Sequence, residues 1–231
     1  MRILRYRNLN KFQYRGLRGL GERICLPPGG DREAKHVFAD RQRGDNPYGS
    51  NPEGVILITG ACGMLGRDLV EALSKENEVV GLDVKKPGFR LQAAGFIKAD
   101  ITNKEEIIKV IRDEKPEIVI HAAAYTDVDG CEQNENLAYR VNGTGTQNVV
   151  LACKECKAII AYISTDFVFD GEKKEPYLES DKPNPLSVYG KSKLEGERHV
   201  SSLLDRYFII RTSWLFGKHG KNFVNTILKL A

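Results

Sequence analysis

Residues 54–73 read GVILITGACGMLGRDLVEAL and place a glycine loop between a short apolar run and a segment with helical periodicity. The run at 54–59 is rich in β-branched residues, which is typical of a buried strand in a parallel sheet. Gly60 would allow a tight turn, Gly63 a close approach of the backbone to a pyrophosphate, and Gly66 close packing of the helix on the sheet. The pyrophosphate would lie at the helix N-terminus. This order predicts a dinucleotide-binding unit, although Gly-x-x-Gly-x-x-Gly is a variant of the usual Gly-x-Gly-x-x-Gly.

An acidic residue follows the next expected strand. That strand covers 78–82 and leads into Asp83, 23 residues after Gly60. An acid there accepts hydrogen bonds from the adenosine ribose hydroxyls, which favours NAD. Lys85 and Lys86 follow at once and could neutralise a 2′-phosphate instead, so NADP stays open. Asp83, Lys85 and Lys86 could also be turn residues without a role in binding.

Strand and helix patterns alternate through the rest of the chain. The further expected strands cover 117–120, 158–164 and 207–211, and the further expected helices cover 104–114, 138–156 and 188–203. Such alternation implies right-handed crossovers and a doubly wound parallel sheet of the Rossmann kind. We expect 54–231 to form this α/β domain.

A tyrosine and a lysine lie four residues apart in the expected helix 188–203, so Tyr189 and Lys193 share one helical face. A free phenol has a pKa of about 10, and bringing it to about 7 takes roughly 4 kcal/mol of differential stabilisation. The Lys193 cation, with the charge of an oxidised nicotinamide, is suited to this task. Thr165, which ends an expected strand, would offer a hydroxyl to a carbonyl oxygen. The combination indicates nicotinamide-dependent chemistry at a ketone or alcohol.

Five sequence blocks together point to a known family. They are TGACGMLG at 59–66, HAAAYTDVD at 121–129, STDFVFDG at 164–171, YGKSKLEGE at 189–197 and RTSWLFG at 211–217. The set closely resembles the dTDP-4-dehydrorhamnose reductases, which are extended short-chain dehydrogenase/reductases. The resemblance runs from about Gly54 to the last residue.

This resemblance implies an NADH- or NADPH-dependent oxidoreductase that reduces the C4 ketone of dTDP-4-dehydro-6-deoxy-L-mannose to dTDP-L-rhamnose, in nucleotide-sugar and cell-envelope polysaccharide biosynthesis. Tyr189 would donate the proton, Lys193 would hold the nicotinamide ribose and lower the phenol pKa, and Thr165 would bind the carbonyl oxygen. The cofactor would contact Gly60, Cys62, Gly63, Met64, Leu65, Gly66, Asp83, Asp100, Ile101, Ala122, Ala123, Ala124, Tyr189 and Lys193. The sugar nucleotide would contact Thr126, Val128 and Trp214.

Some of these positions keep a second interpretation. Ala122 and Ala123 could equally be packing residues, Asp100 could equally be a cap, and Trp214 could equally lie in the core. We expect His121 to be a strand-end residue and not a catalyst, because the phenol already supplies the acid. Arg211 lies too near an expected strand to be assigned to a phosphate.

Charge and cysteine content limit the partners. Residues 1–53 hold 11 Lys or Arg against 6 Asp or Glu, which leaves 24 against 25 in the remainder, so no nucleic-acid groove is expected. No apolar run reaches the ~18 to 20 residues of a membrane span. Five cysteines without a secretory leader favour a reducing cytoplasm. Cys153-x-x-Cys156 has no second pair or nearby histidine, so we expect no metal site there and expect Cys153 to pack inward.

The two ends depart from the family pattern. The basic N-terminal extension over 1–53 is expected to be disordered, because it lacks sustained periodicity and carries a PPGG break at 27–30. This chain ends within a helix that is expected to start at about Asn222, whereas the reductases usually continue well beyond that point. We therefore expect a complete cofactor part, an incomplete substrate-binding part and uncertain activity.

Two other functions stay open. One is a non-catalytic nucleotide-binding regulatory subunit of the methionine adenosyltransferase type, whose members often lose the Tyr or the Lys. The other is a different nucleotide-sugar epimerase or dehydratase. The resemblance also allows Mg²⁺ and a homodimer, and the sequence does not decide between NAD and NADP.

Overall fold

The structure is a computed structural model, and it describes residues 54–220, 222, 224, 226 and 227. The extension expected over 1–53 lies outside the described residues, as does most of the helix expected from about Asn222.

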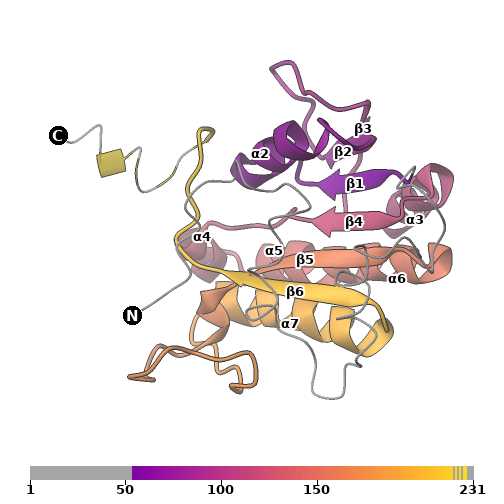
Figure 1. The fold of residues 1–231 in the computed structure, drawn as a ribbon. Coiled ribbons are helices and arrows are strands. Elements are labelled where there is room, and N and C mark those ends of the chain that lie inside the picture. The colour runs from indigo at the N-terminus through magenta and orange to yellow at the C-terminus, as the bar shows by residue number, and fades with distance from the viewer. Residues whose placement is uncertain (1–53, 221, 223, 225, 228–231) are drawn as a thin grey trace, which may run out of the picture.

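Six strands form one parallel sheet in the order β3-β2-β1-β4-β5-β6 (Figure 1). They are β1 (Ile56–Thr59), β2 (Val79–Asp83), β3 (Gly95–Lys98), β4 (Ile118–His121), β5 (Ile159–Thr165) and β6 (Tyr207–Thr212). The chain first builds outward from β1 to β3 and then crosses back to build from β4 to β6, which is the strand order of dinucleotide-binding folds. The expected doubly wound parallel sheet is confirmed.

The edge strand β3 was not among the expected strands. Its four residues begin with a glycine, are only partly buried and show no strict alternation. The strand forms through parallel pairing with β2, which sets Phe96 beside Gly81 and Ile97 beside Leu82. Its existence therefore depends on a tertiary partner that the local sequence does not reveal.

The helices of the described part are α2 (Met64–Leu73), α3 (Lys104–Glu114), α4 (Val128–Gln133), α5 (Glu135–Ala138), α6 (Thr146–Cys156) and α7 (Val188–Leu203). A π-helical stretch, η4 (Tyr139–Gly145), joins α5 to α6, so the regular helix expected over 138–156 is wrong in its first half. Two glycines of η4 let this wider helical turn pack closely against its neighbours. A Cβ on Gly143 would lie 2.5 Å from the Glu195 carboxylate of α7, and one on Gly145 would lie 2.9 Å from Ile101.

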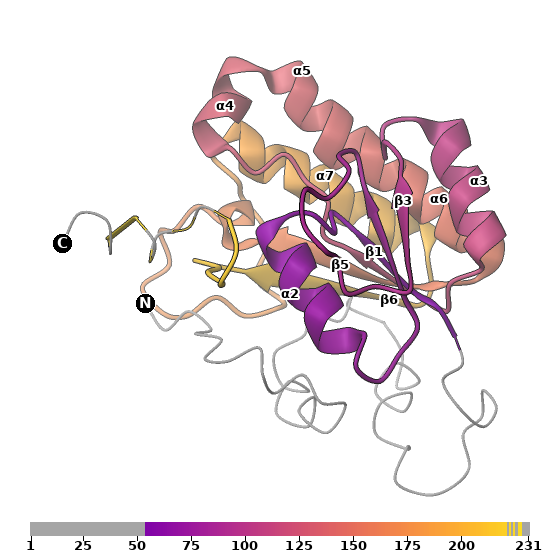
Figure 2. The ribbon, with the colours of Figure 1, turned by 90° about the horizontal axis from the view of Figure 1, so that it is seen from above.

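Helices cover both faces of the sheet (Figure 2). Ile56 and Ile58 of β1 pack against Leu69 of α2 on one face. Leu57, which points the other way, belongs to the larger core that also includes Cys153 of α6. Because the side chains of β1 alternate between the two faces of the sheet, this one strand packs against helices of both layers. Cys153 is fully buried, as expected.

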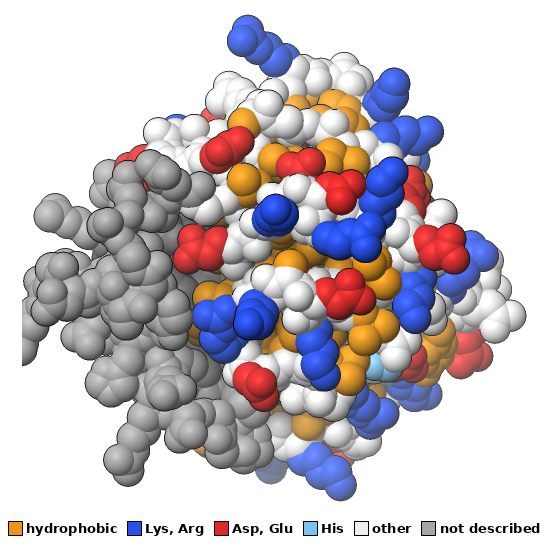
Figure 3. Space-filling view, turned by 90° about the vertical axis from the view of Figure 1, so that its right-hand side faces the viewer, with side chains coloured by type: hydrophobic (Ala, Val, Ile, Leu, Met, Phe, Trp, Pro, Cys, Tyr) orange, Lys and Arg blue, Asp and Glu red, His pale blue; other side chains and the backbone are white. Residues whose placement is uncertain are grey.

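The surface shows no long single-sign stretch on the face drawn in Figure 3, where Lys and Arg side chains are interspersed with Asp and Glu. Within the described residues, no helix is both long enough and apolar enough to cross a bilayer.

The carboxyl ends of the strands meet at one edge of the sheet. All six strands end there in polar or charged residues, namely Thr59, Asp83, Lys98, His121, Thr165 and Thr212. Ligands of open α/β sheets bind at this edge, next to the point where the strand order reverses.

Candidate active site

The glycine loop has the conformation that its residues predict. Gly60 adopts φ 71°, and a Cβ there would lie 2.7 Å from the Ala123 backbone nitrogen. A Cβ on Gly66 would overlap the Gly60 carbonyl, so the helix reaches the loop only because this residue is glycine. Gly63 is the exposed N-cap of α2. The free N–H groups of the first helical turn are thus open to an anionic ligand.

Asp83 ties the end of β2 to this loop. Its Oδ2 accepts a hydrogen bond from the Cys62 N–H at 3.0 Å, and its Oδ1 accepts one from the Lys85 N–H at 3.1 Å. The structure therefore brings the expected ribose-binding acid beside the glycine loop.

Asp100 and Ile101 make the contacts of a packed turn. The Asp100 Oδ1 accepts from the Thr102 N–H at 2.9 Å, and the Asp100 N–H donates to Glu106 Oε2 at 3.2 Å. Ile101 is 6% exposed and lies in the main core. The side chain that caps α3 is that of Asn103, whose Oδ1 accepts from the Glu106 N–H at 3.3 Å, so the capping interpretation of Asp100 is wrong.

The alanines after β4 lie against the glycine loop. The Ala122 N–H donates to the Thr59 carbonyl at 3.3 Å, and the Ala123 N–H donates to Thr59 Oγ1 at 3.2 Å. With the close approach of Gly60 to Ala123, these bonds hold residues 122–123 beside the glycine loop. Small side chains leave this edge of the sheet open.

His121 is a buried structural residue, as expected. Its Nδ1 lies 2.7 Å from Thr59 Oγ1 and its Nε2 lies 3.0 Å from Thr146 Oγ1. Burial, with a smaller contribution from the Lys193 charge, lowers its pKa to about 3. The imidazole is therefore neutral near pH 7, and Thr146 continues the network to the Tyr162 hydroxyl.

Thr165 and Tyr189 come together at the end of β5 and the start of α7. Their side chains lie close enough for the Thr165 hydroxyl to affect the phenol pKa, and the Phe167 ring packs edge-on against the phenol with centroids 5.6 Å apart. Burial raises the pKa of Tyr189 to about 12, and the nearby Thr165 hydroxyl opposes the rise. The Thr165 hydroxyl itself donates to Asp166 Oδ1 at 3.1 Å. The lowered phenol pKa expected from Lys193 is not seen in this structure, because desolvation dominates.

Lys193 lies one turn along the same helix and is almost fully buried, at 2% exposure. Its Nζ donates to the Ile163 carbonyl at 2.7 Å and lies 4.1 Å from the centroid of the Tyr162 ring. Burial lowers its pKa to about 7, while the Glu197 carboxylate acts in the opposite direction. The effect of Lys193 on the His121 pKa links this side chain to the β1–β4 side of the site.

Glu197, one further turn along α7, was not among the expected site residues. It accepts from Arg211 Nε at 2.9 Å and from Arg211 Nη2 at 2.7 Å, and the Ser164 hydroxyl donates to it at 2.5 Å. The i, i+4, i+8 spacing of Tyr189, Lys193 and Glu197 is a signal that could have found it. Arg211, left unassigned above, is thus a partner of this carboxylate.

Asn142 on η4 was also missed. Its Oδ1 accepts from the Tyr125 N–H at 2.8 Å, and its Nδ2 donates to the Tyr125 carbonyl and to Ser192 Oγ, each at 3.0 Å. Ser192 in turn donates to the Tyr189 carbonyl at 2.8 Å. No signal in a regular helical pattern could have found this residue, because its position depends on the π-helical turn.

The residues expected to contact a sugar lie at the rim of the site. Thr126 is exposed just before α4, and Val128 is half-buried at the first position of that helix. The start of α7 is tied to α4, because the Val188 N–H donates to Glu132 Oε1 at 2.7 Å. Trp214 is 64% exposed with φ 53°, which excludes the core role.

Comparisons with known proteins agree with this arrangement. A family model described as the RmlD substrate binding domain matches residues 54–231. The chain is 44% identical over 176 residues to a protein from Aggregatibacter actinomycetemcomitans named dTDP-4-dehydrorhamnose reductase, and the match covers 76% of this chain and 56% of that relative.

Two solved structures extend the comparison. The dTDP-4-dehydrorhamnose reductase of Bacillus anthracis, in complex with NADP, matches with a TM-score of 0.70 and 42% identity over 77% of this chain and 59% of that one. The Bordetella bronchiseptica enzyme WbmG, in complex with NAD and UDP, matches with a TM-score of 0.56 and 27% identity over 63% of this chain and 48% of that one. The chain spans a little over half the length of the curated relatives it matches.

Proposed function

The chain belongs to the RmlD substrate binding domain family, and we propose that residues 54–231 form the NAD(P)-binding and catalytic part of a nucleotide-sugar reductase. The reaction is the reduction of the C4 ketone of dTDP-4-dehydro-6-deoxy-L-mannose to dTDP-L-rhamnose. The observation that carries the proposal is the proximity of the Thr165 hydroxyl to the Tyr189 phenol, one helical turn from the buried Lys193. A hydroxyl pair beside a lysine, at the carboxyl edge of a dinucleotide-binding sheet, is suited to protonating a ketone oxygen as it is reduced.

Each residue of this group has a separate task. Tyr189 donates its proton to the C4 oxygen, and its raised pKa keeps the phenol protonated at neutral pH. Thr165 hydrogen-bonds the substrate oxygen. Lys193 holds the nicotinamide ribose, and its positive charge stabilises the phenolate that forms as the proton leaves. The bound dinucleotide supplies the hydride.

We propose that the cofactor is NADPH or NADH. Its pyrophosphate lies at Gly60, Cys62, Gly63, Met64, Leu65 and Gly66, and its adenosine ribose at Asp83, with Ala122, Ala123 and Ala124 against its middle. The solved B. anthracis relative binds NADP and the B. bronchiseptica relative binds NAD, so the likeness alone supports either form. Asp100 and Ile101 remain assigned to the adenine by the resemblance alone, because their side chains and the Asp100 N–H have other contacts.

The sugar nucleotide contacts Thr126, Val128 and Trp214. The exposed indole of Trp214 offers a flat apolar face for a base or a sugar ring. The UDP in the WbmG structure supports a ligand that contains a nucleoside diphosphate. A cytoplasmic location fits the free thiols of Cys62, Cys131, Cys153 and Cys156, and the proposal allows a homodimer.

The regulatory-subunit alternative is less well supported. Such a subunit needs the nucleotide site but has no use for a proton donor, whereas Thr165, Tyr189 and Lys193 are all in place. Copurification with a partner enzyme, without turnover, would favour it.

The proposal is tested by mixing the chain with NADPH or NADH and following nicotinamide fluorescence, first alone and then after adding dTDP-4-dehydro-6-deoxy-L-mannose. Binding in the first step and oxidation in the second support the reductase. Binding without oxidation leaves only the nucleotide-binding part of the proposal, and the absence of binding contradicts it.

A further inference from the structure

The chain leaves β6 through a tryptophan in an unusual backbone conformation. Trp214 adopts φ 53°, in the left-handed region that a bulky aromatic residue rarely occupies, and its side chain is 64% exposed. An exposed ring gains little from core packing that would offset this strain. Residues held in such conformations cluster at ligand-binding sites, where the surrounding structure keeps them in place. The strain at Trp214 therefore indicates a function, which depends on the contacts that hold it.

A side-chain hydrogen bond fixes the chain directly before Trp214. The pairing of β5 with β6 ends at Thr165 and Thr212. The next residue of each strand continues the connection, because Ser213 Oγ donates to Asp166 Oδ2. The other oxygen of this carboxylate, Oδ1, accepts from the Thr165 hydroxyl at 3.1 Å. Asp166 thus joins the residue before Trp214 to the residue proposed to bind the ketone oxygen.

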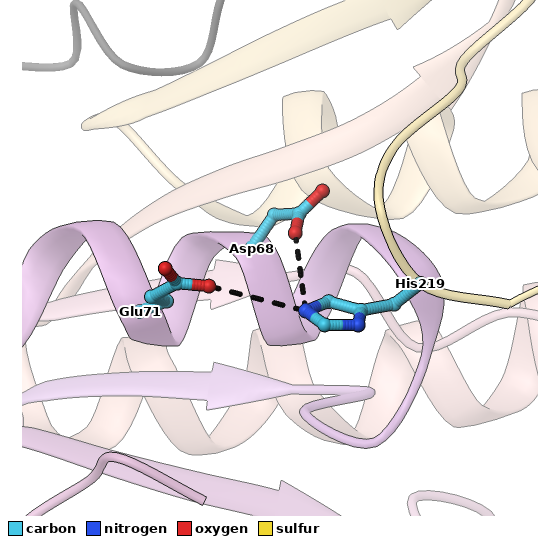
Figure 4. Close-up of side chains that lie close together, drawn as sticks. All are labelled: Asp68, Glu71 and His219. Carbon is cyan, nitrogen blue, oxygen red and sulfur yellow. Dashed lines mark ion pairs between the residues drawn. The ribbon is translucent and has the colours of Figure 1, made fainter.

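The segment that follows the tryptophan is held at its far end by α2 (Figure 4). His219 Nε2 lies 3.7 Å from Asp68 Oδ1 and 3.9 Å from Glu71 Oε2, and both carboxylates belong to α2. A Cβ on Gly217 would overlap the Asp68 carboxylate, so this close approach requires glycine. The segment therefore runs between two anchored ends, β6 on one side and the helix that begins at the glycine loop on the other.

We propose that the hydrogen bond from Ser213 to Asp166 positions the Trp214 indole as a platform on which a ring of the sugar nucleotide stacks. Ser213 and Asp166 are positioning residues in this role, because they act on the ligand through the tryptophan. The inference rests on the proposed function and deepens it, since it names what preorganises the substrate rim. A ring that is fixed before the ligand arrives loses little conformational freedom on binding, and this favours affinity.

The test uses Trp214 itself as the probe, because it is the sole tryptophan of the 231 residues. Its fluorescence is titrated with dTDP-glucose, a sugar nucleotide without a ketone, so that no turnover is needed. We expect dTDP-glucose to quench the wild-type emission. Ser213→Ala should lower the fluorescence anisotropy of the unliganded chain and weaken binding by about tenfold, because a hydrogen bond to a charged acceptor is lost.

Two further variants separate this role from a general loss of structure. Ser213→Thr keeps a hydroxyl at the same position and should retain the anisotropy and the affinity of the wild type. Ser201→Ala is the matched control, because it removes a serine hydroxyl that donates at 3.3 Å to the Arg198 carbonyl of its own helix, outside the proposed site. That variant should also behave as the wild type does. Titration with dTDP alone assigns the stacked ring: quenching by dTDP indicates the base, and quenching by dTDP-glucose only indicates the hexose.

Equal dTDP-glucose affinity in Ser213→Ala and the wild type would overturn the inference. So would a wild-type emission that does not respond to dTDP-glucose, or a loss in Ser213→Thr as large as that in Ser213→Ala. These outcomes are distinct from failure of the reductase, which is judged by NADPH binding and oxidation. A chain that binds NADPH while Trp214 ignores dTDP-glucose would refute the platform and leave the cofactor site standing.

Discussion

The hydroxyl of Thr165 lies beside the phenol of Tyr189 and opposes the rise in its pKa, across the junction between the end of β5 and the first turn of α7. Hydrogen bonds fix the backbone at or next to both residues. Thr212 donates to the Ser164 carbonyl at 3.0 Å, and Ser192 donates to the Tyr189 carbonyl at 2.8 Å. The proposed proton donor and its neighbour thus lie next to backbone that is fixed by strand pairing and within a helix.

The glycine loop predicts a sharp contrast between two Gly→Ala variants. Gly60→Ala should destabilise the fold by at least about 1 to 2 kcal/mol, because its positive φ disfavours a side chain and the new Cβ would meet Ala123. It should also weaken NADPH binding. Gly88→Ala is the control, since a Cβ there meets nothing within 4 Å. Denaturant unfolding and fluorescence titration check both, and equal behaviour of the two variants would refute the role of Gly60.

The Glu197–Arg211 pair should contribute strongly to stability. Their side chains are 5% and 15% exposed, and removing one partner leaves a buried charge unpaired, at a cost of about 3 to 5 kcal/mol. We expect Arg211→Met to lower the free energy of unfolding by this amount. Asp113→Asn breaks an exposed pair with Arg112 and should change it by less than about 1 kcal/mol. Similar losses in both variants would contradict the assignment.

Lys193 should make stability rise with pH in the alkaline range. Its pKa is about 7 in the folded chain against 10.5 for the free side chain, so between these values the unfolded state binds more protons. Stability from this group therefore increases as pH rises from about 7 toward 10.5. Urea unfolding across that window should show a smaller rise in Lys193→Met than in the wild type. Parallel curves for the two proteins would show that Lys193 is not desolvated.

His121 should make the fold sensitive to acid. Its pKa is lowered to about 3 from 6.5, so the unfolded state binds the extra proton between these values and stability falls as pH drops through this range. His121→Asn should lose less stability than the wild type between pH values of about 6.5 and 4, whatever its stability at neutral pH. An equal slope in both proteins would mean that the imidazole is protonated in the fold.

Much of this architecture follows from local sequence. The strand, glycine loop and helix at 54–73 are locally consistent, so their order and the residue types at Gly60 and Gly66 were enough to predict the fold. The Tyr189–Lys193 spacing placed both side chains on one face of α7, and the structure has them there. Asp83 was found because its place at the end of β2 follows from the βαβ pattern.

What the sequence did not reveal depends on contacts between distant segments. β3 exists through its pairing with β2, and η4 through its packing against α7, so neither has a local signal. The raised pKa of Tyr189 was not anticipated, because a charge partner can be read from spacing whereas burial cannot. Asn142 had no local signal, because its role comes from Tyr125 and from the π-helical turn. Glu197 did have one in its spacing along α7, but its partner Arg211 lies on another element.

The most direct test of the account is the rate of NADPH oxidation with dTDP-4-dehydro-6-deoxy-L-mannose, compared between the wild-type chain, Tyr189→Phe and the control Tyr139→Phe, with NADPH affinity measured in each. If Tyr189 donates the proton, its loss should slow oxidation by about 10² to 10⁴ at unchanged NADPH affinity, while Tyr139→Phe stays at the wild-type rate. Oxidation by Tyr189→Phe at the wild-type rate would contradict the account.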